Sequence, residues 1–135
     1  MAKRVMHFFM QMKTPTVTAQ EHKFAKTKSG KMVVYDIPEI KAAKIMIRDR
    51  LIPHRPEEPL TGAVGLLVKW CFPITGKHQN GDYKTTKPDT DNLEKMLKDI
   101  MTELHFWEDD AQVASEIVEK FWADVPGIYI EVWQL

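Results

Sequence analysis

The stretch KPDTDNL, residues 87–93, opens the segment that decides the fold, because a regular apolar pattern starts at its last residue. From there, apolar side chains recur at i, i+3, i+4, i+7, i+8 and i+11, which is the spacing of one buried helix face. These side chains are Leu93, Met96, Leu97, Ile100, Met101 and Leu104. The pattern predicts an amphipathic helix that packs against the rest of the domain and has an acidic stretch at its entrance.

Outward from this helix, the chain alternates between β-rich segments and one more helical pattern. The segment 63–72, AVGLLVKWCF, is apolar and lies between Gly62 and Pro73, which predicts a central strand. Apolar residues at helical spacing predict a second helix from Pro38 to Leu51. Further strands are predicted at residues 4–11, 32–35, 112–122 and 128–133. Turns are predicted at 28–31 and 126–127, and a mobile loop at 74–87.

The composition fits a single globular domain spanning residues 1–135. Of the 135 residues, 44% are hydrophobic and 28% are charged, which is enough for one core and little more. The single cysteine, Cys71, excludes an internal disulfide and a cysteine-based zinc site, and it favours the reducing cytoplasm. The five histidines show no ligand spacing. No window approaches the ~20 apolar residues of a membrane helix, so we expect no membrane partner.

The charges are unevenly distributed along the chain, although the formal net charge is zero. Residues 1–60 hold 12 Lys and Arg against 6 Asp and Glu, whereas residues 61–135 hold 7 against 13. A basic half that contacts phosphates and an acidic half that collects metal ions would produce this asymmetry. Two solvated charged faces would produce it equally well.

Four aspartates flank the predicted helix. Asp89 and Asp91 stand at its entrance, and Asp109 and Asp110 follow its end. Asp91 is well placed to cap the helix, with Glu94 three residues further on, an ordinary structural role that accounts for one carboxylate. The whole set offers the carboxylates that Mg²⁺ prefers, if the loop before the helix and the strand after it converge. The residues alone leave both the capping role and the metal site open.

Two other features have both a structural and a functional interpretation. Lys95 lies one helical turn after Asp91, which is typical of a surface ion pair contributing ~0.3 to 0.5 kcal/mol. Alternatively, its ammonium group stabilises negative charge on a phosphate. Several aromatic side chains either stack on bases or fill the core, and the core is favoured for aromatic residues in strands. They are Trp70, Phe72, Phe106, Trp107, Phe121 and Trp122.

The segment KPDTDNLEK, residues 87–95, is followed by Asp110 within FWEDDAQV, nineteen residues after Asp91. This combination resembles the signature of the RusA family of Holliday junction resolvases, and the match is specific from Lys87 to Val113. The resemblance implies a small α/β (α+β) fold with a mixed β-sheet packed by two main helices. It also implies a homodimer that nicks four-way junction DNA symmetrically with Mg²⁺, for which Mn²⁺ can substitute, and that needs no organic cofactor.

The resemblance assigns roles to individual positions. The residues that match the family's catalytic positions are three metal-binding acids and one essential lysine, namely Asp89, Asp91, Asp110 and Lys95. Asn92 and Asp109 lie within the motif and are interpreted as supporting residues. The basic residues that we expect to contact DNA are Lys84, Lys87, Lys41, Lys44 and Arg48. A metal-dependent nuclease for other branched or duplex DNA, and a non-catalytic DNA-binding protein, are the alternatives.

Overall fold

Strand β4, Val64–Pro73, runs through the middle of the main sheet, as its apolar sequence predicts. The computed structural model describes residues 3–18, 22–26, 30, 32–36 and 38–135. Along β4, fully buried side chains such as Trp70 and Phe72 alternate with partly buried ones such as Lys69 and Cys71. A strand covered on one face and partly covered on the other is suited to an interior position in a sheet.

The main sheet has four strands in the order β1-β6-β4-β5. Strand β1 (Lys3–Gln11) pairs antiparallel with β6 (Gly127–Gln134), and β6 pairs antiparallel with β4. Strand β5 (Val113–Ala123) pairs parallel with β4, with Leu67 opposite Ile117. The sheet is therefore mixed, as expected, and β5 forms one of its edges.

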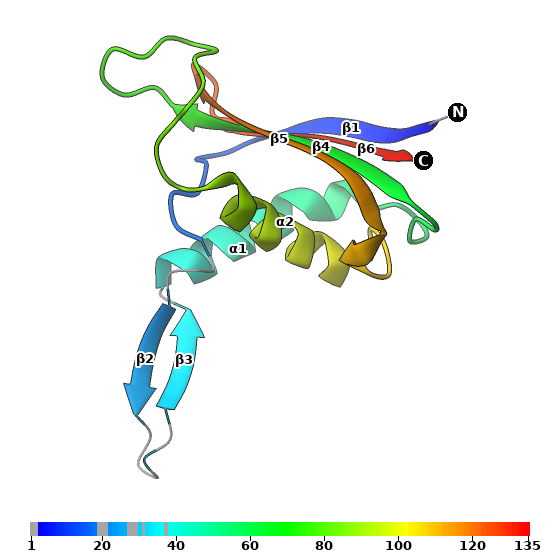
Figure 1. The fold of residues 1–135 in the computed structure, drawn as a ribbon, viewed down its shortest axis with the longest axis horizontal. Helices are drawn as coiled ribbons and strands as arrows, with labels where there is room; N and C mark the ends of the chain where they lie inside the picture. Colours follow the sequence, from blue (N-terminus) through cyan, green and yellow to red (C-terminus); the bar gives the residue numbers. More distant parts are fainter. Residues whose placement is uncertain (1–2, 19–21, 27–29, 31, 37) are drawn as a thin grey trace.

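Helices α1 (Pro38–Leu51) and α2 (Thr90–Glu103) lie side by side on one face of the main sheet (Figure 1). Helix α2 connects β4 to β5, and parallel neighbours require such a crossover. Its apolar stripe is buried, with Leu93, Leu97 and Met101 fully enclosed. The two predicted helices are confirmed, and the fold is a small α+β domain. In the part of the chain that the structure describes, no helix is both long and apolar enough to cross a membrane.

The remaining elements are short. Strands β2 (His22–Lys26) and β3 (Met32–Asp36) pair antiparallel in a separate two-stranded sheet. The 3₁₀ turns η1 (Ile52–His54) and η2 (Asp110–Gln112) follow α1 and precede β5. The turn predicted at residues 28–31 lies outside the described residues, apart from its third position.

One hydrophobic core fills the space between the main sheet and its two helices. The sheet contributes Ile130, α1 contributes Ile47 and α2 contributes Leu97, and all three are fully buried. Phe121 is only partly buried. The interpretation of the other strand and loop aromatics as core residues is confirmed, because five are buried, namely Trp70, Phe72, Phe106, Trp107 and Trp122.

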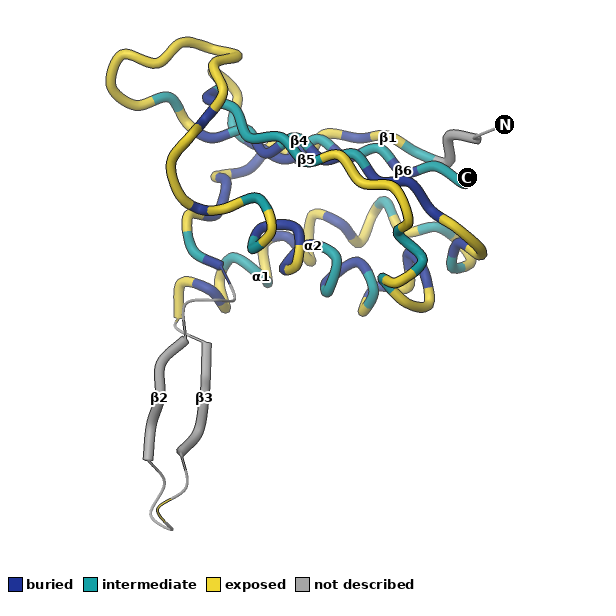
Figure 2. The backbone as a smooth tube through the Cα atoms, in the orientation of Figure 1, coloured by how far each residue is buried: buried dark blue, intermediate teal, exposed yellow. Residues whose placement is uncertain are grey.

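The connection from β4 to α2 is irregular and exposed along most of residues 74–87 (Figure 2). Its second half lies along the outer edge of β5, because the N–H of Trp122 donates to the carbonyl of Asp82 at 2.8 Å. The N–H of Lys84 donates in turn to the carbonyl of Lys120 at 3.0 Å. The predicted loop is therefore confirmed as a loop attached to the end of β5, and its mobility stays a prediction.

Candidate active site

The entrance of α2 presents two carboxylates that the helix itself does not use. The helix starts at Thr90, so Asp89 is the residue that precedes it, and the backbone carbonyl of Asp89 accepts the N–H of Leu93 at 3.1 Å. The side chain of Asp89 makes no capping hydrogen bond. Asp91 lies in the first turn, and both aspartates are exposed. The helix dipole favours negative charge at this end.

The expectation that Asp91 caps the helix together with Glu94 is wrong. Asp91 lies within the first helical turn, whereas a capping residue has extended backbone. The side chain of Glu94 is buried against the sheet, where its Oε1 accepts the Nε1–H of Trp70 at 2.8 Å. Side-chain capping therefore accounts for neither Asp89 nor Asp91.

Lys95 is exposed on α2 and does not pair with the aspartates at the entrance. Its Nζ lies 3.2 Å from Oδ2 of Asp99, four residues further along the helix, rather than beside Asp91. The two side chains are 60% and 47% exposed, and ion pairs this exposed contribute little to stability. The ammonium group of Lys95 can therefore leave Asp99 for a charged ligand at little energetic cost.

The second acidic pair lies at the other end of α2, in the turn before β5. Asp109 has a structural role, because its Oδ1 accepts the N–H of Ala111 at 2.9 Å and its own N–H donates to Gln112 Oε1 at 3.1 Å. Gln112 Nε2 donates to the carbonyl of Leu60 at 2.9 Å, which fixes this turn to the chain before β4. Asp110 is partly exposed, and its side chain makes no hydrogen bond or ion pair with the rest of the described chain.

Helix α2 separates the first turn, which holds Asp91, from the turn η2, which holds Asp110. Figure 1 shows this helix running along the sheet between β4 and β5 in the chain. Helix α2 has 14 residues and is therefore about 21 Å long. Among the described residues, no three His, Cys, Asp or Glu side chains lie close enough together to hold a metal ion. The expected convergence of the loop before the helix and the strand after it does not occur within one chain.

The parallel pairing of β4 with β5 explains this separation. Helix α2 returns from the end of β4 to the start of β5, so its entrance lies near one end of the strands and its exit near the other. Near the end of β5, the Nζ of Lys120 donates to the carbonyls of Thr86 at 2.7 Å and Pro88 at 2.8 Å. Lys120 thereby anchors the residue immediately before Asp89. Sequence reasoning missed this lysine, because an isolated lysine in a strand carries no signal.

Glu94 is a second residue whose environment sequence reasoning did not predict. Its side chain is 3% exposed, and burial, reinforced by the neighbouring Glu116, raises its pKa to about 9. Its Oε2 has no hydrogen-bond partner in the described structure, and Glu116 pairs with Lys98 at 3.2 Å. Burial and the nearby carboxylate both favour the protonated form of Glu94. A signal existed in the sequence, since Glu94, Leu97 and Met101 follow the i, i+3, i+7 spacing of the buried face.

The basic residues expected to contact DNA lie in different environments. Lys41 and Lys87 are exposed. Lys84, by contrast, is only 8% exposed. Its Nζ lies 4.4 Å from the ring centroid of Trp122 and 5.2 Å from that of Phe72. Lys84 is therefore largely buried beside two aromatic rings, unlike the exposed Lys41 and Lys87.

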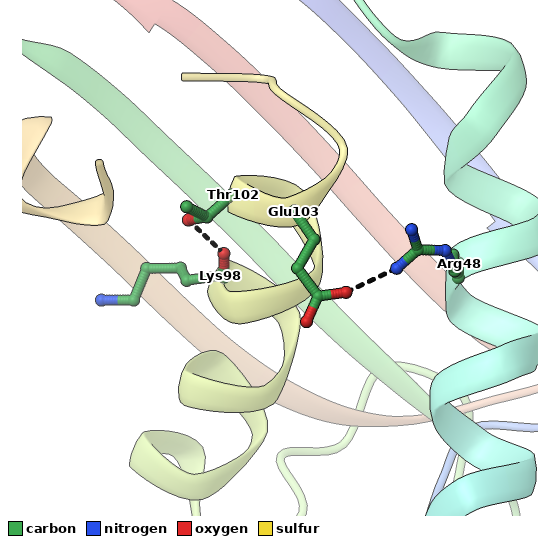
Figure 3. Close-up of polar contacts among 4 residues, drawn as sticks. All are labelled: Arg48, Lys98, Thr102 and Glu103. Carbon is green, nitrogen blue, oxygen red and sulfur yellow. Dashed lines mark hydrogen bonds and ion pairs between the residues drawn. The ribbon is translucent and has the colours of Figure 1, made fainter. Parts of the chain in front are cut away.

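Arg48 connects the two helices, as Figure 3 shows. Its guanidinium on α1 lies 2.5 Å from the carboxylate of Glu103 on α2. On α2 itself, the hydroxyl of Thr102 donates to the carbonyl of Lys98 at 2.8 Å. Lys44 and Arg48 line a groove between the helices together with acidic side chains. The charge of Arg48 is thus partly neutralised within the protein.

Comparison with known proteins agrees with the motif at the entrance of α2. A family model described as "Endodeoxyribonuclease RusA" matches residues 14–133. The chain belongs to the RusA family. It is 30% identical over 120 residues to the crossover junction endodeoxyribonuclease RusA of Lactococcus phage r1t, covering 87% of this chain and 90% of that one. It is also 31% identical over 116 residues to the uncharacterized protein YqaN of Bacillus subtilis (strain 168), covering 78% and 81%.

Proposed function

We propose that this RusA-family protein is an endodeoxyribonuclease that resolves Holliday junctions by symmetric paired nicks, during DNA recombination and repair in the cytoplasm. The observation that carries the proposal is the state of three motif carboxylates, Asp89, Asp91 and Asp110. Their side chains have no hydrogen bond or ion pair within the described residues, so they are available to a ligand. The name of the phage relative, a crossover junction endodeoxyribonuclease, supports the choice of substrate.

Mg²⁺ is the ion that we propose for these carboxylates, with Mn²⁺ as a substitute. The donor chemistry fits, because hard divalent cations prefer carboxylate oxygens and keep several waters and phosphate oxygens as further ligands. Such an ion, when bound, supplies a Lewis acid and an acidified water for phosphodiester hydrolysis. The residues that would hold it are Asp89 and Asp91 at the entrance of α2 and Asp110 at its exit. One chain alone does not gather them.

A second copy of the chain would resolve this difficulty, and we propose that the protein acts as a homodimer. If the α2 helices of two copies run antiparallel, the entrance of one lies beside the exit of the other. Each site would then combine Asp89 and Asp91 of one copy with Asp110 of the second. The edge strand β5 follows Asp110 and is exposed over residues 114–117, so an antiparallel copy has an edge to pair with. Two equivalent sites suit a substrate that is cut twice.

Lys95 and Asn92 complete the proposed site. The ammonium group of Lys95, released from Asp99, would stabilise the negative charge that develops on the phosphate during cleavage. Asn92 is partly exposed in the first turn of α2, between the motif aspartates and Lys95, where its amide would assist in orienting substrate. The exposed lysines Lys41 and Lys87 would contact phosphates further along the DNA.

The test is incubation of the purified protein with a synthetic four-way junction and a matched linear duplex, in Mg²⁺, in Mn²⁺ and in EDTA. Symmetric metal-dependent nicks in the junction alone are the expected result. Cleavage of both substrates would identify a nuclease of broader specificity. Cleavage of neither, with retained junction binding, would identify a non-catalytic DNA-binding protein.

A further inference from the structure

A cavity of about 320 Å³ opens beside the loop that leads into α2. Its wall is mainly apolar, and it includes the rings of Phe72 and Trp122. Polar residues line the rest together with Pro73, namely Lys13, Thr14, Thr16, Thr75 and Lys84. No carboxylate belongs to the described lining, so the cavity combines an apolar wall with positive charge alone.

The positive charge beside this cavity has no carboxylate partner among the described residues. The ammonium of Lys84 donates to the hydroxyl of Thr86, and that of Lys120 donates to two backbone carbonyls. Neither lysine forms an ion pair within the described residues. Burial, and after it the charge of Lys120, lower the pKa of Lys84. Among the described residues, these two neighbouring cations contact only neutral groups, so their charge is available to an anionic ligand.

The same loop connects the cavity to the proposed catalytic site. Lys84 stands five residues before Asp89, a span of at most about 18 Å of extended chain. Lys120 fixes the loop between them through the carbonyl of Pro88. A ligand in the cavity would therefore touch the segment that carries the first motif aspartate.

We propose that this cavity receives one unpaired nucleotide of the DNA strand, with its phosphate against Lys13 and Lys84 and its base or sugar against the apolar wall. The proposal rests on the proposed function and names a binding site for its substrate. Small-ligand sites are typically apolar cavities with a few polar groups, and single strands are typically bound by cations beside apolar or aromatic surface. A free mononucleotide has the same chemistry, so the experiment must separate the two sources.

The test measures binding of a fluorescein-labelled short oligothymidylate to the metal-free protein by anisotropy at several salt concentrations. Lys84→Met keeps the side-chain volume and removes the charge. We expect it to weaken binding by roughly five- to tenfold and to reduce the salt slope by about 0.7, the loss of one phosphate contact to a single strand. Thr75→Trp places a large ring at the mouth of the cavity, and because Thr75 is exposed the variant should fold. Its binding should weaken by a similar factor.

Lys77→Met is the matched control, because Lys77 is an exposed lysine of the same loop and does not line the cavity. Its binding should change by less than about twofold. Wild-type affinity in both Lys84→Met and Thr75→Trp would overturn the inference, and if Lys84→Met failed to fold, Thr75→Trp would decide alone. Equal affinity for thymidine monophosphate and the oligonucleotide would show that the cavity binds a free nucleotide, and would overturn the proposal that its ligand belongs to a DNA strand. The readout is binding, so absence of junction cleavage in the wild type would reject the proposed function without touching this result.

Discussion

The Nζ of Lys120 lies 2.8 Å from the carbonyl oxygen of Pro88, directly before Asp89. A second carbonyl, that of Thr86, lies 2.7 Å from the same Nζ, so one side chain holds the entrance of α2 against β5.

Hydrogen bonds to a charged donor contribute ~1.5 to 3 kcal/mol when buried, and partial exposure reduces this. Lys120→Met should therefore lower the free energy of unfolding by about 1 to 2 kcal/mol and reduce kcat for junction cleavage more than it weakens junction binding. Lys120→Arg, which keeps the charge and the donors, should recover turnover. An unchanged kcat in Lys120→Met would show that the contact does not position Asp89.

Glu94 makes the stability of the protein depend on pH. Its folded pKa of about 9 lies above the ordinary 4.5, so the folded state binds this proton more tightly than the unfolded state does. The resulting stabilisation is fully present below pH 4.5 and is lost as the pH rises through 9. Glu94→Gln keeps an acceptor for Trp70 and cannot ionise, so its free energy of unfolding, measured in urea, should fall less with pH across this window. Exposed Glu57→Gln is the control, and parallel pH profiles for all three proteins would contradict the assignment.

Asp91→Asn should abolish metal-dependent cleavage and leave junction binding intact. The substitution removes a ligand's charge without changing its shape, while the basic surface that contacts phosphates is unaltered. Loss of a carboxylate from a helix N-terminus costs only ~0.3 to 1 kcal/mol, so the melting temperature should change little. Cleavage is measured in Mg²⁺ and binding in EDTA, with Asp124→Asn, an exposed aspartate near the end of β5, as the control. Loss of binding in the folded Asp91→Asn protein would contradict the separation of metal binding by Asp91 from DNA binding by the basic surface.

Lys95→Ala should fold normally and cleave slowly. Its exposed pair with Asp99 contributes at most a few tenths of a kcal/mol, so thermal unfolding should be nearly unchanged. Removal of one preorganised charge at a phosphate typically lowers kcat by roughly 10²-fold or more. Single-turnover cleavage of the junction measures this directly. Normal turnover in Lys95→Ala would return the lysine to the role of an ordinary surface ion pair.

The separation of Asp91 from Asp110 predicts complementation between two inactive variants. If each site combines acids from two copies, a mixed dimer of Asp91→Asn and Asp110→Asn has one site with both lesions and one fully intact site. Mixing and re-equilibrating the two inactive proteins should therefore restore nicking, on one strand of the junction at a time. If each site lies within one chain, every site in the mixture carries a lesion and the mixture stays inactive. Refolded single variants, unmixed, provide the baseline.

The secondary structure was largely predictable because its signals are local. The apolar run that became β4 and the helical spacing that starts at Leu93 each specify their element without reference to the rest of the chain. The parallel pairing of β4 with β5 has no comparable local signature. Without it, the sequence could not show that the entrance of α2 meets Lys120 while its exit meets the start of β5.

The candidate site was predictable in its membership and not in its arrangement. The motif identifies Asp89, Asp91 and Asp110, but it carries no information on the length of rigid helix between them. Glu94 lies three residues after an aspartate, a spacing that is typical of a capping box and predicts a capping role. Burial beside Trp70 decided otherwise. Environments of this kind depend on contacts between distant segments, which a single sequence does not record.

In the proposed dimer, the length of helix α2 sets the distance between the two active sites. In a two-fold pair whose sites each combine one entrance with one exit, the length of this helix fixes the distance between the two scissile phosphates. Because a helix is stiff, that distance cannot adapt to the DNA, and the DNA must adapt to the protein. An insertion of one helical turn would change the separation of the two cuts by about 5.4 Å, shared equally between them. Selectivity for junctions would then arise from spacing between the cuts as much as from contacts at either one.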